Sequence, residues 1–206
     1  MSGPVRAVCF DLLSALLDSW TVWDGVAESL GSRALGLPWR RRYLEQTAGA
    51  GRYVPYLDLV AAAAVDVGLS RQAASMLEAR WDTLQPWPDV VPGLRASTLP
   101  TAVVTNCSQV LGLRAVPRVG APFSVVVTAE RAGAYKPDSA PYRFAAAELG
   151  IPPADVAYLA GSAFDAVGAE RHGFRVTWVN RLADPRPSGF HGPILDSLRT
   201  WWPAFG

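Results

Sequence analysis

Short apolar runs rich in β-branched residues alternate with helix-like stretches over much of the chain. Five runs predict buried strands, at residues 5–10, 101–105, 123–127, 156–160 and 175–179. Between them, apolar positions at helical spacing predict helices at residues 109–116, 141–149 and 166–172. Strands that alternate with helices in this way are typical of parallel βαβ units. We therefore predict an α/β fold built on a doubly wound parallel sheet.

Residues 19–92 follow a different pattern. This interval contains four helix-like segments and no convincing strand; the segments are residues 22–30, 39–47, 57–67 and 71–84. Ligand sites of open α/β sheets lie beyond the carboxyl ends of the strands, so helices inserted after the first strand would cover that site and exclude water. We therefore expect a core domain of residues 1–18 and 93–206 and an inserted helical cap of residues 19–92.

Composition and charge narrow the class of partner. The chain has 206 residues, half of them hydrophobic, and a formal net charge of +1. That charge gives no electrostatic reason to expect nucleic acid or an anionic membrane. The two cysteines, Cys9 and Cys107, are too few for a disulfide scaffold. Because there is also no signal-peptide pattern and no apolar stretch that could span a bilayer, we expect a cytoplasmic protein that acts on a small molecule.

Polar residues stand where the predicted strands end. Asp11 follows the first strand, Thr105 and Asn106 end the second, Asp165 lies shortly after the fourth, and Lys136 lies in a loop before a helix. In a parallel sheet these positions converge on one crevice. A carboxylate beside a fixed ammonium is attracted by about 4 kcal/mol at an intermediate effective dielectric, and it stays ionised as a nucleophile should. The pattern predicts that Asp11 is a covalent nucleophile held deprotonated by Lys136.

Each of these residues also has a purely structural interpretation. An aspartate after a strand is common in turns. Thr105, Asn106 or Asp165 could cap the helix that follows. A lysine before proline, as at Lys136, is often a solvated loop residue. The argument for a site comes from their combination, since all fall at the ends of suitable strands.

Four segments carry a resemblance to a known family. Residues 10–11, 105–106, 136–137 and 161–169 resemble, in this order, the four-motif series of the haloacid dehalogenase superfamily. Residues 178–181 resemble its last core strand. The resemblance implies a Rossmann-like core with an inserted helical cap, and a hydrolase that forms an ester on Asp11.

One position separates two branches of that superfamily. Leu13 stands where the phosphatases carry a second aspartate, and Asp165 has no acidic neighbour in its motif. Magnesium prefers carboxylate oxygens, so these residues disfavour a magnesium-dependent phosphatase. The chain more closely resembles the L-2-haloacid dehalogenases, which use no metal, and we expect no metal and no other cofactor.

Further residues resemble that branch. Arg40 resembles the cap arginine that takes the leaving halide, although it could instead belong to a basic helix face with its two neighbours. The resemblance implies a homodimer and a substrate that is a small 2-halo acid. The implied catalytic residues are Asp11, Thr105, Asn106, Lys136 and Asp165, and the implied substrate-binding residues are Leu13, Arg40, Leu44, Tyr142, Ser162 and Phe164.

The chain departs from the branch at three positions. Ala15 replaces a threonine beside the nucleophile, while Ala160 and Ser162 stand where the fourth motif has serine and asparagine. Each lost hydrogen-bond partner costs roughly 1–3 kcal/mol when the remaining group stays buried. These substitutions favour a second hypothesis, a catalytically silent member that binds a ligand or partner in its crevice. A phosphatase is third, and a serine hydrolase on Ser162 is remote because the segment lacks the Gly-x-Ser-x-Gly pattern.

Overall fold

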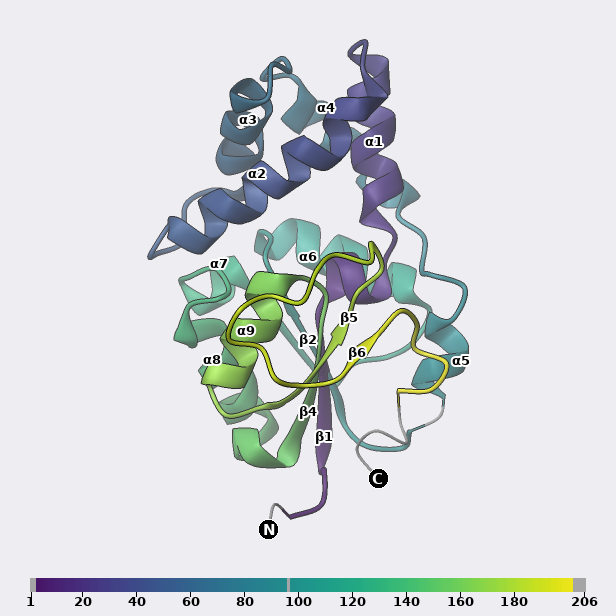
Figure 1. Cartoon of the computed structure of the whole chain (residues 1–206), viewed down its shortest axis with the longest axis vertical. Helices are drawn as coiled ribbons and strands as arrows, with labels where there is room; N and C mark the ends of the chain where they lie inside the picture. Colours follow the sequence, from purple (N-terminus) through teal and green to yellow (C-terminus); the bar gives the residue numbers. More distant parts are fainter. Residues whose placement is uncertain (1–2, 96, 202–206) are drawn as a thin grey trace.

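A six-stranded parallel sheet forms the centre of the molecule (Figure 1). The computed structural model describes residues 3–95 and 97–201. The strand order is β3-β2-β1-β4-β5-β6, and every neighbouring pair is parallel. The strands are β1 (Ala7–Phe10), β2 (Thr101–Thr105), β3 (Val125–Thr128), β4 (Val156–Ala160), β5 (Arg175–Val179) and β6 (Ile194–Leu195). The predicted α/β fold with a doubly wound sheet is confirmed.

Apolar runs predicted the strands because the sheet is covered on both faces. In β1, Val8 and Phe10 belong to one buried cluster, while Ala7 and Cys9 belong to another on the opposite face. The packing elements include α5 (Val90–Leu94), α6 (Gln109–Ala115), α7 (Ala129–Ala132), α8 (Ser139–Leu149) and α9 (Ala163–Arg171). The sequence pattern missed β6, because two half-buried residues carry no periodic signal.

A layer of helices stands beyond the carboxyl ends of the strands (Figure 1). We call it the helical layer, and it consists of α1 (Ser19–Ser29), α2 (Gly36–Gly49), α3 (Tyr56–Asp66) and α4 (Ala73–Ala79) with short 3-10 turns. Its interior is aromatic: the ring centroids of Trp23 and Trp39 are 4.3 Å apart, and Trp39 Nε1 donates to the Val60 carbonyl at 2.8 Å. The helix predicted at 71–84 was too long, because it breaks into α4 and a 3-10 turn at Trp81–Thr83.

The chain enters and leaves the helical layer side by side. Leu17 and Pro86 form an antiparallel bridge, and the Asp18 N–H donates to the Gln85 carbonyl at 2.8 Å. The next helix, α5, lies beside the sheet (Figure 1), and position 92, where we placed the domain boundary, falls inside it. No described helix is long and apolar enough to cross a membrane.

Candidate active site

Asp11 is the first residue after β1, and its carboxylate is held by the turn that follows. Leu12–Leu16 form one π-helical turn, and Asp11 is its N-cap. The Oδ2 atom accepts hydrogen bonds from Ser14 N at 3.0 Å, Ser14 Oγ at 2.9 Å and Ala15 N at 3.3 Å. Its Oδ1 atom faces Lys136. Asp11 is therefore both a capping residue and a buried carboxylate directed into the crevice.

Lys136 joins two carboxylates that are distant in the sequence. Its Nζ lies 2.9 Å from Asp11 Oδ1 and 2.8 Å from Asp165 Oδ2, and it also donates to the Val104 carbonyl at 2.8 Å. Only 4% of Lys136 is exposed, so the interpretation as a solvated loop residue is wrong. One ammonium thus lies between two carboxylates at the carboxyl edge of the sheet.

Asn106 fixes the loop that carries this lysine. Its Nδ2 donates to the Lys136 carbonyl at 3.0 Å, and its Oδ1 accepts from Lys136 N at 2.7 Å. Ser108, and not Thr105 or Asn106, caps α6. Thr105 is buried, with its Oγ1 3.6 Å from Cys107 Sγ. Burial raises the pKa of Cys107 to about 12, so this thiol stays neutral and is a poor nucleophile.

Asp165 lies in the first turn of α9, but the cap of that helix is Ser162, whose Oγ accepts from Asp165 N at 3.3 Å. The Asp165 carboxylate is therefore free for other partners. Its Oδ1 accepts hydrogen bonds from Tyr142 Oη at 2.9 Å and Tyr158 Oη at 3.0 Å. Tyr158 also lies 3.2 Å from Lys136 Nζ. Sequence reasoning missed Tyr158, because an aromatic residue within an apolar strand has the appearance of core.

The surroundings shift the two carboxylates in opposite directions. Burial raises the pKa of Asp11, but the charge and hydrogen bond of Lys136, the Ser14 hydrogen bond and the charge of Arg40 outweigh it, so the pKa lies below the usual value of 3.8. Burial and the nearby charge of Asp11 raise the pKa of Asp165 above that value despite Lys136. A carboxylate that stays ionised and a neighbour that binds a proton more readily are suited to different roles in one reaction.

Arg40 approaches this site from α2. Its Nη2 lies 3.2 Å from Ser14 Oγ, its Nη1 donates to Ser19 Oγ, and its guanidinium lies 3.9 Å from the centroid of the Trp20 ring. Arg40 is 4% exposed, whereas Arg41 and Arg42 form exposed ion pairs, so the interpretation of Arg40 as part of a basic helix face is wrong. A buried cation therefore faces Asp11 from the helical layer.

These groups line a small cavity of about 20 Å³ between the sheet and the helical layer. Nine of the eleven residues that the sequence predicted line it: Asp11, Leu13, Arg40, Leu44, Asn106, Lys136, Ser162, Phe164 and Asp165. Tyr43 and Thr47 line it too. Thr105 and Tyr142 do not, so Tyr142 acts on the site through Asp165 and not as part of the cavity wall. The resemblance implied a substrate-binding role for Tyr142 and a catalytic role for Thr105, and neither residue is among those that line this cavity.

Two hydroxyl groups donate to the carboxylates close to two of the three departures noted in the sequence. Ser14 donates to Asp11 one residue before the missing threonine hydroxyl at Ala15, and Tyr158 donates to Asp165 two residues before Ala160. Ser14 could have been predicted from the sequence, because it carries a hydroxyl group and lies next to Ala15. Gly161 permits this packing, because a Cβ at that position would overlap Asp11 Oδ2 and Ser14 Oγ.

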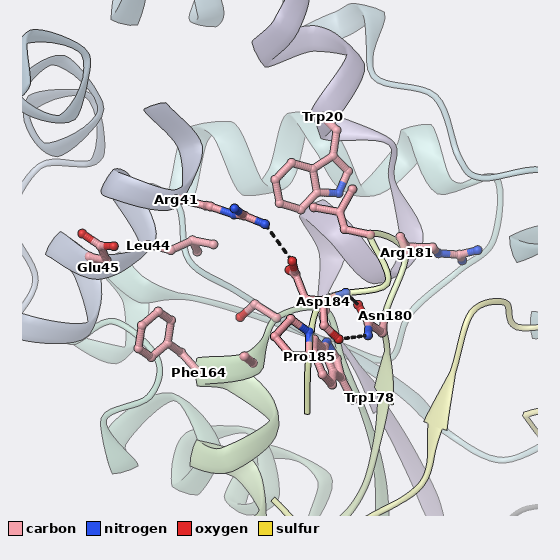
Figure 2. Close-up of a pocket in the computed structure, with 14 residues that line it drawn as sticks. Trp20, Arg41, Leu44, Glu45, Phe164, Trp178, Asn180, Arg181, Asp184 and Pro185 are labelled. Atoms are coloured by element: carbon pink, nitrogen blue, oxygen red, sulfur yellow. Dashed lines mark hydrogen bonds and ion pairs between the residues drawn. The ribbon is translucent and has the colours of Figure 1, made fainter. Parts of the chain in front are cut away.

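A second cavity, of about 380 Å³, is larger than the one at Asp11; Figure 2 shows the residues that line it. The two share Leu44, Ser162 and Phe164 as wall residues. The Arg41 guanidinium of α2 crosses its mouth to Asp184 of the loop after β5, at 2.7 Å. The small cavity with Asp11, Lys136 and Asp165 therefore borders a larger one along Leu44, Ser162 and Phe164.

This chain is similar to known proteins in both sequence and fold. The model of the haloacid dehalogenase-like hydrolases matches residues 5–173. (S)-2-haloacid dehalogenase 1 of Pseudomonas sp. (strain CBS-3) is 29% identical, over 91% of this chain and 89% of its own length. (S)-2-haloacid dehalogenase H-109 of Pseudomonas putida is 28% identical over 95% and 90%. The structure of L-2-haloacid dehalogenase from Xanthobacter autotrophicus has a TM-score of 0.83 at 23% identity, covering 95% of this chain and 96% of that one.

Proposed function

The chain belongs to the haloacid dehalogenase-like hydrolase family, and from this premise we propose that it hydrolyses 2-halo acids through an ester on Asp11. The observation that carries the proposal is the Lys136 ammonium between Asp11 and Asp165, at 2.9 and 2.8 Å, with Arg40 facing them from α2. The names of the relatives, which describe 2-haloacid dehalogenases, support the same reaction.

In the first step, Asp11 attacks the carbon that carries the halogen. Oδ1 is the attacking oxygen, because it accepts one described hydrogen bond, from Lys136, whereas Oδ2 accepts three. A bond forms between Oδ1 and carbon 2, and the carbon–halogen bond breaks with its electron pair on the halide. The buried guanidinium of Arg40 stabilises the departing anion. The product of this step is an aspartyl ester and a halide ion.

In the second step, water hydrolyses that ester. The Asp165 carboxylate takes a proton from the water, which attacks Cγ of Asp11. Negative charge then develops on Oδ2, where the N–H groups of Ser14 and Ala15 already point. The bond between Cγ and Oδ1 breaks, Oδ1 leaves as the hydroxyl oxygen of the 2-hydroxy acid, and the proton returns from Asp165. The second water proton, which the new Asp11 carboxyl group carries, is released to solvent, and the free Asp11 carboxylate is restored.

We also propose that the helical layer is a cap domain that encloses this chemistry. The cavity walls support this role, since Arg40, Tyr43, Leu44 and Thr47 all come from α2. The chain crossing at Leu17 and Pro86 supports a boundary near residues 17 and 86 in place of the one expected at 92. The homodimer and the cytoplasmic location expected from the sequence stay predictions.

Halide release tests the proposed reaction. Wild-type protein is incubated with 2-chloropropionate and 2-bromopropionate without added magnesium, beside Asp11→Asn and the control Asp58→Asn, an exposed aspartate of α3. We expect release that Asp11→Asn abolishes and Asp58→Asn preserves. Equal release by wild type and Asp11→Asn would contradict the covalent mechanism. No halide release by folded wild type would favour a silent binding protein. In a parallel assay, phosphate release from a phosphate monoester only when magnesium is added would favour a phosphatase.

A further inference from the structure

We propose that the larger cavity binds the side chain of the substrate, and that the preferred substrates are 2-halo acids with an uncharged aromatic or branched apolar side chain. This inference rests on the proposed function, because it places the reacting carbon at Asp11. The inference goes beyond the proposed function because it names the side chain of the substrate, which in 2-halopropionate is only a methyl group.

Space is the first argument. The cavity at Asp11 measures about 20 Å³, which is room for about one water molecule. The adjoining cavity measures about 380 Å³, within the range of small-molecule sites. Leu44, Ser162 and Phe164 belong to the walls of both cavities. A substrate whose carbon 2 lies at Asp11 would therefore extend a larger side chain past these residues into the larger cavity.

The walls are the second argument, because they are largely aromatic and aliphatic. Trp20 of α1, Phe164 of α9 and Trp178 of β5 contribute rings, and Leu44 and Leu182 contribute aliphatic surface (Figure 2). Phe164 is 44% exposed and Leu182 is 37% exposed, which places two of the large exposed hydrophobic side chains of the described chain on this one cavity. Such a surface gains free energy when an apolar ligand covers it.

Charge is the third argument. The two arginines in the wall are both engaged: Arg41 pairs with Asp184 at 2.7 Å, and Arg181 pairs with the buried Asp89 at 2.9 Å. Glu45 pairs with Arg42 at 3.1 Å. An anionic or cationic side chain would have to break one of these pairs, so the cavity favours an uncharged group.

A substrate comparison with a filled cavity tests the proposal. Bromide release is measured for 2-bromopropionate and 2-bromo-3-phenylpropionate with wild type, with Ala163→Phe, and with Leu113→Phe. Ala163 lines only the larger of the two cavities, whereas Leu113 is an exposed residue of α6 that lines neither. We expect kcat/KM to be higher for the phenyl substrate by about tenfold or more. Ala163→Phe reverses most of that preference, and Leu113→Phe preserves it.

A binding measurement separates this inference from the proposed reaction. The 2-hydroxy acids 3-phenyllactate and lactate are titrated calorimetrically into wild type and Ala163→Phe. Tighter binding of 3-phenyllactate that Ala163→Phe weakens supports the cavity assignment even if no bromide is released, a result that would defeat the proposed function alone. Release from 2-bromopropionate with no phenyl preference, or a preference that Ala163→Phe leaves intact, overturns the inference alone. Absence of both bromide release and 3-phenyllactate binding overturns both.

Discussion

Asp11 and Asp165 share one lysine, yet their pKa values are shifted in opposite directions. The Asp11 carboxylate gains hydrogen bonds from Ser14 and Ala15 besides Lys136, whereas Asp165 pairs with two tyrosine hydroxyls in a fully buried setting. The difference supports the proposed roles of Asp11 as nucleophile and Asp165 as base, because a base with a raised pKa accepts a proton from water more readily. Both roles follow from the partners of each residue and not from its type.

These opposite shifts predict that the two steps fail at different pH. As pH falls, Asp165 protonates first because its pKa is raised above 3.8, while Asp11, with its lowered pKa, stays ionised. Ester formation then continues after ester hydrolysis has slowed. We expect the Asp11 ester to accumulate during turnover of 2-bromopropionate as the pH falls through the raised pKa of Asp165, as seen by mass spectrometry after acid quench. Loss of turnover on this acid side without ester accumulation would contradict the assignment.

Ser14 provides a second test at this scale. Ser14→Ala removes the hydroxyl that donates to Asp11 Oδ2 at 2.9 Å and accepts from Arg40 at 3.2 Å. Loss of a buried partner costs roughly 1–3 kcal/mol, so kcat/KM falls by about tenfold or more. Ser75→Ala, at an exposed position of α4, is the control and keeps wild-type activity. If both variants kept wild-type activity, Ser14 would not be part of the mechanism.

At the scale of elements, the turn after each strand sets the distances between reacting groups. The π-helical turn Leu12–Leu16 follows β1, and the short link at Gly161 follows β4 and leads into α9. The two turns touch, since Gly161 leaves only enough space for Asp11 and Ser14. The predicted strand bounds at β2, β4 and β5 were correct because all five residues of β4, and the last four of β2 and of β5, are buried.

Because these two turns are in contact, we expect that adding one methyl group at Gly161 lowers kcat/KM strongly. In Gly161→Ala the added Cβ would overlap Asp11 Oδ2 and Ser14 Oγ, so the carboxylate must move. We expect kcat/KM to fall by about a hundredfold, since small misplacements of reacting groups cost that much. Gly49→Ala, at the end of α2 with no atom within 4 Å of the added Cβ, is the matched control. Equal halide release by the two alanine variants would show that the link does not position Asp11.

At the scale of the whole molecule, the helical layer and the sheet share one apolar cluster, and polar contacts between them add to it. Tyr43 Oη of α2 donates to the Asn106 carbonyl at 2.5 Å, and Asn106 in turn holds the Lys136 loop. Arg41 reaches Asp184 on the far side of the larger cavity. The closed arrangement around Asp11 therefore depends on contacts between segments that are distant in the sequence.

A pair of tyrosines in the helical layer tests this connection. Tyr43→Phe removes the hydrogen bond to Asn106, and we expect the free energy of unfolding to fall by about 1 kcal/mol. Tyr56→Phe is the matched control, because the Tyr56 hydroxyl is buried without a partner in the described chain and its removal costs little. Urea denaturation measures both. Equal free energies of unfolding for Tyr43→Phe and wild type would show that this contact adds no stability.

The fold and most of the residues that line the small cavity could be predicted from the sequence for one physical reason. Buried parallel strands are continuous apolar runs, and their carboxyl ends meet, so Asp11, Asn106, Lys136 and Asp165 could be grouped without coordinates. Side-chain direction could not be predicted: Tyr142 points at Asp165 and not into the cavity. The sequence also did not show that α5 belongs with the sheet and not with the inserted helices, because a five-residue helix gives too little periodicity to place it.

Single turnover in oxygen-18 water tests the central claim, the ester on Asp11, most directly. Excess enzyme is mixed with 2-bromopropionate, and both the 2-hydroxy acid and the peptide that contains Asp11 are analysed by mass spectrometry. The mechanism transfers Oδ1 of Asp11 to the product, so we predict an unlabelled product and one oxygen-18 atom in the Asp11 carboxylate. A labelled product with an unlabelled Asp11 peptide would mean that water attacks the substrate directly, and would contradict the account.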